Sequence, residues 1–155
     1  MVYDKIGERD KAIADLRRQL EISPDSTSGM NALGYIMLSS PKYDLNEAFK
    51  LIQAAYQVDP ENPAINDSLG WAYYLKGDAE TALPYLQYAF EQYPDAEVAS
   101  HLGEVLWKLG KPEDAKAIWN EGLKQEGDIG LLKETMRRFN IPVPPRKKHP
   151  SAKTK

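Results

Sequence analysis

The stretch NDSLGWAYYLKGDAETALPYLQYAFEQYP, residues 66–94, decides the fold of this chain. Its first half places Leu69, Gly70 and Tyr73 on one side of a helix. Its second half repeats apolar residues at intervals of four and three, the spacing of one helical face. The stretch therefore predicts a pair of amphipathic helices, followed by a turn at Pro94. The apolar residues of the second half are Ala82, Leu86, Ala89 and Phe90.

The same pattern recurs along the chain with a period of about 34 residues. Three kinds of marker share this period, namely a turn proline, a Leu-Gly pair in the first helix and an alanine in the second helix. A period of this length predicts helical hairpins that stack on one another, which is an all-α superhelix, or α-α solenoid, with a right-handed twist. The markers are Pro24, Pro60 and Pro94; Leu33-Gly34, Leu69-Gly70 and Leu102-Gly103; and Ala48, Ala82 and Ala115.

The period divides the chain into units. Because the pattern starts in its second half, we expect residue 1 to lie inside a longer protein, of which this chain is a C-terminal piece. A short amphipathic stretch after the last repeat is suited to cap the solenoid, and the prolines that follow it forbid further helix. The expected units are half a repeat (1–24), three full repeats (25–60, 61–94 and 95–127), a capping helix (128–139) and a disordered basic tail (140–155).

Local signals mark the expected helix ends. Asp44 with Glu47 has the spacing of a capping box, and Asn62 before Pro63 is typical of a helix start. Pro84 lies inside its expected helix, where it removes a backbone hydrogen bond, so we expect a bend there rather than a break. Further candidate N-caps are Asp95 and Asp128.

These residues resemble the tetratricopeptide-repeat family, whose pattern is W-x₂-L-G-x₂-Y followed by A-x₃-F, A and P. Residues 66–94 match it best, with departures at Asn66 and Leu86, where the family prefers aromatic residues. The resemblance covers about residues 1–139. It implies an all-α solenoid that serves as a scaffold or adaptor between proteins. NALGYIM (31–37), NDSLGWAYYLKGD (66–78) and HLGEVLWKLG (101–110) carry a narrower resemblance. They are similar to the C-terminal repeats of large Gram-negative tetratricopeptide lipoproteins, which would place the chain in a bacterial periplasmic adaptor.

In this family the first helix of each hairpin lines a concave groove. The resemblance implies that aromatic and acidic residues line this groove, and we expect it to bind a protein or peptide. We expect apolar ligand side chains on the aromatic rings and a basic ligand residue near Asp67 and Glu104. The alternative is that the same side chains pack between repeats, as expected for Trp119 and Phe90. The groove residues are Asn31, Tyr35, Leu38, Asp67, Trp71, Tyr74, Ser100, Glu104, Trp107 and Lys108.

The sequence contains no motif for catalysis or for a cofactor. It has no cysteine, which excludes thiolate catalysis and cysteine-ligated zinc, and no phosphate loop or nucleophile elbow. His101 and His149 offer no metal pair, because the second lies in the tail, and we expect each to be a satisfied or solvent-exposed histidine. We therefore predict a protein that is not an enzyme and that takes no cofactor, metal or small-molecule substrate.

Charge is distributed unevenly along the chain. Seven Lys or Arg residues and no acid follow from Arg137 onward, although the net charge of the whole chain is −3. The basic tail could contact nucleic acid or an anionic membrane surface, but the acidic body argues against phosphate binding. Self-association, with a homodimer as the simplest form, is the other alternative function. No apolar run is long enough to cross a bilayer, and the compartment is not fixed by this sequence.

Overall fold

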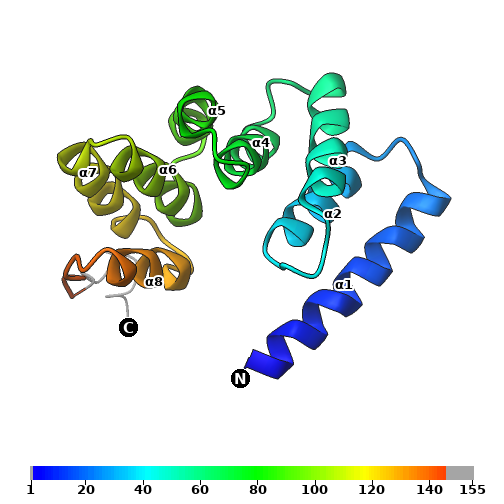
Figure 1. Ribbon diagram of the computed structural model, residues 1–155, viewed down its shortest axis with the longest axis horizontal. Helices are drawn as coiled ribbons and strands as arrows, with labels where there is room; N and C mark the ends of the chain where they lie inside the picture. Colours follow the sequence, from blue (N-terminus) through cyan, green and yellow to red (C-terminus); the bar gives the residue numbers. More distant parts are fainter. Residues whose placement is uncertain (1, 146–155) are drawn as a thin grey trace, which may run out of the picture.

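The computed structural model describes residues 2–145, with side chains from Gly7 onward. Eight α-helices and no strand form this part of the chain, which confirms the predicted all-α architecture (Figure 1). None of these helices is both long and apolar enough to cross a membrane. The helices are α1 (Val2–Ile22), α2 (Thr27–Leu38), α3 (Leu45–Val58), α4 (Pro63–Leu75), α5 (Ala79–Gln92), α6 (Ala96–Lys108), α7 (Pro112–Leu123) and α8 (Gly130–Arg138).

Consecutive helices pair into hairpins that stack along an arc (Figure 1). The helix pairs α2 with α3, α4 with α5 and α6 with α7 make the most extensive contacts. The first helices of the hairpins, α2, α4 and α6, also contact one another in that order, and α8 continues the row by packing on α6. The concave face of the arc is therefore built from the first helices, as the family resemblance implied.

Small residues set the close approach within each hairpin. A Cβ atom added at Gly70 would lie 2.7 Å from Cγ of Leu86, and one added at Gly103 would lie 2.0 Å from Nε1 of Trp119. Real Cβ atoms do not come so close to a neighbour, so both positions are restricted to glycine by the packing of the second helix. The Leu-Gly pairs that define the repeat thus mark the contact point of each hairpin.

Three of the four predicted helix N-caps agree with the hydrogen bonds. Asp44 accepts from the backbone N–H of Asn46, and the Asn62 side chain accepts from two N–H groups at the start of α4. Glu47 does not complete a capping box with Asp44; its carboxylate pairs instead with Arg17 of α1 at 3.4 Å. The helix α5 continues through Pro84 without a break. Asp95 is likewise the N-cap of α6 and accepts from the N–H of Val98. Asp128 accepts from the N–H of Gly130, but the N-cap of α8 is Ile129, so the prediction of Asp128 as the cap is wrong by one residue.

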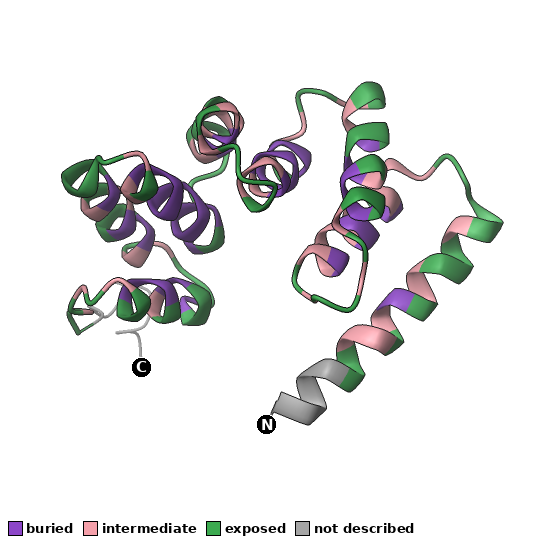
Figure 2. Ribbon diagram, in the orientation of Figure 1, coloured by how far each residue is buried: buried purple, intermediate pink, exposed green. Residues whose placement is uncertain are grey.

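Buried apolar side chains form three clusters along the arc (Figure 2). The largest lies between α5, α6, α7 and α8 and is centred on Trp119, which is fully buried. Phe90 is partly buried against the same cluster, so both aromatic residues take the packing positions predicted for them. The N-terminal cluster is smaller, and Ile13 is its buried contribution from α1. The packing is therefore densest toward the C-terminal half.

Candidate functional site

Four aromatic rings form a row across the concave face, which we call the concave aromatic row: Tyr35 of α2, Trp71 and Tyr74 of α4, and His101 of α6. The indole of Trp71 stacks on His101 with ring centroids 4.1 Å apart and on Tyr74 at 5.0 Å. Tyr35 meets His101 edge-on at 6.0 Å. Stacked and edge-on arrangements are the favourable ones for aromatic pairs, so the row is fixed in place before any ligand arrives.

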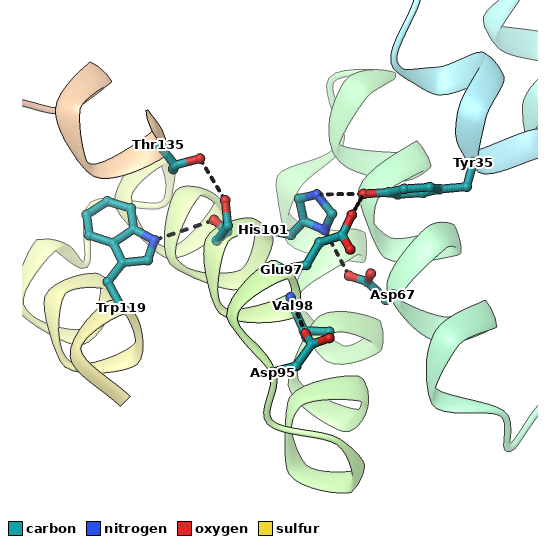
Figure 3. A network of polar contacts seen from close by, with 9 residues as sticks. Tyr35, Asp67, Asp95, Glu97, Val98, His101, Trp119 and Thr135 are labelled. Atoms are coloured by element: carbon teal, nitrogen blue, oxygen red, sulfur yellow. Dashed lines mark hydrogen bonds and ion pairs between the residues drawn. The ribbon is translucent and has the colours of Figure 1, made fainter. Parts of the chain in front are cut away.

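A hydrogen-bond network that includes two members of the row, Tyr35 and His101, joins the helices α2, α4 and α6 (Figure 3). Nδ1 of His101 lies 2.9 Å from the carboxylate of Asp67, and Nε2 lies 3.4 Å from the hydroxyl of Tyr35. The Tyr35 hydroxyl also donates to Glu97. His101 is 2% exposed and Asp67 is 8% exposed, so this contact is shielded from water. The expected satisfied histidine is confirmed, and it belongs to the candidate site.

Burial and neighbouring charge act in opposite directions on His101. Burial disfavours the imidazolium and lowers the pKa of His101. The negative charge of Asp67 raises this pKa, and Glu97 and Glu104 raise it further. The sum of these effects is a pKa above the usual value for histidine. Burial raises the pKa of the Tyr35 hydroxyl, and the charge of Glu97 raises it further. The network thus favours a charged His101 and a neutral Tyr35.

A second polar contact lies at the C-terminal end of the row. Glu104 is 7% exposed and accepts hydrogen bonds from the Tyr74 hydroxyl at 2.9 Å and from the Arg138 guanidinium at 2.7 Å. Burial raises the pKa of Tyr74, and the hydrogen bond to Glu104 raises it further. The helix α8 therefore contributes a charged side chain to a site that α4 and α6 otherwise form.

The remaining predicted groove residues lie in different environments, and several of them pack within the chain. Ser100 is 1% exposed and bonds to Thr135 of α8 at 2.7 Å, so the expectation that it faces an open groove is wrong. Trp107 is partly buried and stacks on Trp119 at 5.9 Å, which is the packing alternative. Leu38 packs partly buried against two apolar clusters. Asn31 is partly buried and Lys108 is exposed.

Sequence reasoning missed the roles of His101, Glu97 and Arg138. In the repeat alignment, Ser100 is equivalent to Asp67 of the preceding repeat. The residue that contacts Asp67 is instead His101, the next residue along α6. One available signal was the helical spacing of 97, 101 and 104, which puts three polar residues on one face of α6. Arg138 carried no such signal, because its contact with Glu104 depends on how α8 returns to α6.

Comparison with known proteins supports the repeat assignment. Two family profiles described as tetratricopeptide repeat match residues 1–26 and residues 73–132. A TPR repeat-containing protein of Pseudomonas aeruginosa, PA4667, is 41% identical over 105 residues, which cover 67% of this chain and 18% of that protein. A TPR repeat-containing protein of Methanocaldococcus jannaschii, MJ1428, is 26% identical over 125 residues, covering 81% of this chain and 22% of that protein. The chain thus spans about a fifth of the length of these relatives.

Solved structures agree on the fold. The thermophilic TPR protein TTC0263 of Thermus thermophilus superposes with a TM-score of 0.70 at 20% identity, covering 88% of this chain and 76% of that one. A structure of MamA superposes with a TM-score of 0.59 at 17% identity, covering 89% of this chain and 82% of that one. With its helical hairpins, its 34-residue period and these matches, the chain belongs to the tetratricopeptide-repeat family, whose stacked hairpins are scaffolds for protein–protein interaction.

Proposed function

We propose that this chain binds a peptide segment of a partner protein along its concave face, with apolar ligand side chains on the concave aromatic row. The observation that carries this proposal is Trp71. Its ring is held between His101 and Tyr74, yet the residue remains partly exposed on the concave side of α4. A rigid, partly exposed aromatic ring loses little conformational entropy on binding and offers a large apolar area.

The charges around the row favour an apolar ligand over a basic one. Asp67 already pairs with His101, and Glu104 already pairs with Arg138. The sequence suggested that these two acids would hold a basic ligand residue; because both are buried and have partners, we no longer expect this. Binding should therefore depend mainly on apolar contact and change little with salt concentration.

One neighbouring feature supports an extended segment rather than a single anchored side chain. A hollow of about 280 Å³ lies beside Tyr35, between α1 and α2. It extends the proposed binding surface from α4 toward the N-terminal end.

Affinity capture with mass spectrometry tests this proposal. The bait is the full chain, compared with Trp71→Ala and with Tyr93→Ala, a matched control because Tyr93 is 61% exposed at the end of α5 and outside the concave row. Circular dichroism establishes that each variant is folded. We expect a partner that the parent chain and the control retain, and that the Trp71 variant binds at least about tenfold more weakly, as for loss of one aromatic anchor.

The opposite pattern would remove the basis of the proposal. If the folded Trp71 variant retained every partner with unchanged affinity, the concave aromatic row would not be the binding surface. If Tyr93→Ala lost the same partner, the outer surface of the solenoid would contribute instead.

A further inference from the structure

A second aromatic surface lies outside the concave face, between the C-terminal end of α3, the start of α4 with the loop before it, and the middle of α5. Three tyrosines line a hollow of about 340 Å³ together with two prolines, Glu61 and Asn66. We call this hollow the tyrosine pocket. The concave aromatic row does not include any of its residues, and the proposed peptide binding makes no use of it. The tyrosines are Tyr56, Tyr85 and Tyr88, and the prolines are Pro60 and Pro84.

The walls of the tyrosine pocket are fixed by contacts within the chain. The ring of Tyr85 stacks on Tyr73 at 5.6 Å and meets the edge of Tyr56 at the same distance. The Tyr88 hydroxyl donates to the backbone carbonyl of Glu61 at 2.8 Å, which ties α5 to the loop before α4. A pocket whose rings are already placed has little ordering cost on binding.

The chemistry of the pocket matches a proline-rich segment. Aromatic-lined grooves recognise polyproline II segments, because rigid proline rings pack on aromatic faces and the segment is already extended. Such a segment has no internal hydrogen bonds, so its carbonyls need donors. The hydroxyls of Tyr56 and Tyr85 have no hydrogen-bond partner among the described residues and can donate to those carbonyls.

This chain carries a segment of that kind. Residues 141–148 read IPVPPRKK, and the structure describes the first five of them as outside any helix or strand. Ile141 and Val143 pack against the C-terminal apolar cluster, whereas Pro142, Pro144 and Pro145 are exposed. The prolines are therefore presented on the surface. The three basic residues that follow them in sequence are complementary to Glu61 in the pocket and to Glu91, one turn beyond Tyr88.

We propose that residues 142–148 of one copy bind the tyrosine pocket of a second copy. A second copy is required because Ile141 and Val143 hold the prolines on the C-terminal cluster of their own chain. The pocket and the segment are different surfaces, so the contact is heterologous. Each copy that donates its segment still has an empty pocket, and association can therefore continue beyond a dimer.

Sedimentation velocity over a concentration series tests this inference on the full chain. We expect the average mass to rise with concentration for the parent chain. Two variants should shift that rise to concentrations higher by about tenfold or more. The segment variant carries Pro142→Ala, Pro144→Ala and Pro145→Ala. The pocket variant carries Glu61→Lys and Tyr85→Phe, which reverse the rim charge and remove one donor while retaining the aromatic ring.

A mixing experiment makes the assignment of the two surfaces specific. At concentrations where only the parent chain associates, neither variant should associate alone. The pocket variant still supplies an intact segment, and the segment variant still supplies an intact pocket. The mixture should therefore form dimers and no larger species. Because the three substituted prolines are exposed, we expect the segment variant to fold with the same stability as the parent chain.

Four results would overturn the inference. Three are a parent chain that is monomeric up to near-millimolar concentration, unchanged association of the segment variant, and mixed variants that fail to pair. The fourth is weaker association of Trp71→Ala. The Trp71→Ala variant separates this surface from the concave face, because it should associate like the parent chain. If it did not, association would use the concave aromatic row, and the tyrosine pocket would be excluded without deciding whether that row also binds a partner peptide.

Discussion

At the scale of single residues, His101 has the most consequential environment in this chain. Its two ring nitrogens face Asp67 of α4 and Tyr35 of α2, and its flat side supports Trp71. A buried imidazolium between a carboxylate and a hydroxyl is stabilised only while both partners stay in place. The position of the Trp71 ring, which is partly exposed, therefore depends on the buried side chain of His101.

We expect the protonation of His101 to make folding stability depend on pH. The pKa of His101 is raised above 6.5 in the folded chain, where Asp67, Glu97 and Glu104 favour its charge and Tyr35 adds a hydrogen-bonding hydroxyl. A raised histidine pKa contributes stability that is fully present below about pH 6.5 and is lost as pH rises through the folded pKa. The free energy of unfolding in urea should therefore contain a contribution that is larger at pH 6 than at pH 9.

Two substitutions control this measurement. His101→Gln retains a hydrogen-bonding side chain without a proton to lose, and should cost about 1–3 kcal/mol at pH 6 because a buried partner is left poorly paired. The difference between pH 6 and pH 9 should shrink in this variant. It should also shrink in Asp67→Asn, which removes the charge that raises the pKa. An undiminished pH difference in both variants would assign the effect to other groups.

The residue scale also shows what the sequence could predict. Leu69, Gly70 and Trp119 lie where the repeat pattern placed them, because hairpin packing is local and periodic. The burial of Ser100 and the Asp67–His101 contact were not predictable in this way, because they depend on how far each hairpin rotates relative to the next. A repeat alignment assigns equivalent positions, whereas side-chain contacts between hairpins follow the superhelical twist.

At the scale of elements, α8 is more than a cover for the last hairpin. Its Thr135 bonds to Ser100 of α6 at 2.7 Å, and both side chains are 1% exposed. Its Arg138 reaches Glu104, which also accepts from Tyr74 of α4. The capping helix is thus connected by polar contacts to two helices of the concave face.

The bond between Ser100 and Thr135 gives a prediction for the junction of α6 and α8. Thr135→Val keeps the shape of the side chain but leaves the Ser100 hydroxyl buried without this partner, so we expect a loss of about 1–3 kcal/mol in the free energy of unfolding. Adding Ser100→Ala should recover much of that loss, because neither partner is then left unpaired. Strictly additive losses in urea unfolding would indicate that the two hydroxyls are not coupled.

Elements were predicted more completely than their contacts. Helix starts at Asp44, Asn62 and Asp95 could be assigned because capping is a property of neighbouring residues. The pairing of Glu47 with Arg17 could not be predicted, because it joins α3 to α1 across 30 positions of the sequence. The expected tail is described only as far as residue 145, and its basic residues from 146 onward lie outside the described residues.

At the scale of the whole molecule, the three apolar clusters imply graded stability along the solenoid. Among its described residues, α1 buries only Ile13, whereas α6 buries most of its length. Stability in a stacked array is the sum of units and their interfaces, so the end with less buried area opens more readily. Native-state hydrogen exchange should therefore show the fastest exchange in α1 and the slowest in α6 and α7. Uniform protection across all helices would indicate one cooperative unit instead.

The contact of Tyr35 with Glu97 and His101 has a consequence for the evolution and engineering of this array. It joins the first full repeat to the third and passes over the second. Repeat arrays commonly grow and shrink by gain or loss of whole units, which preserves every contact between immediate neighbours. Here a unit inserted on either side of α4 would separate the partners, and removal of the middle unit would delete Asp67. The three repeats therefore form a block of fixed length, which should be transplanted or recombined as a whole and not unit by unit.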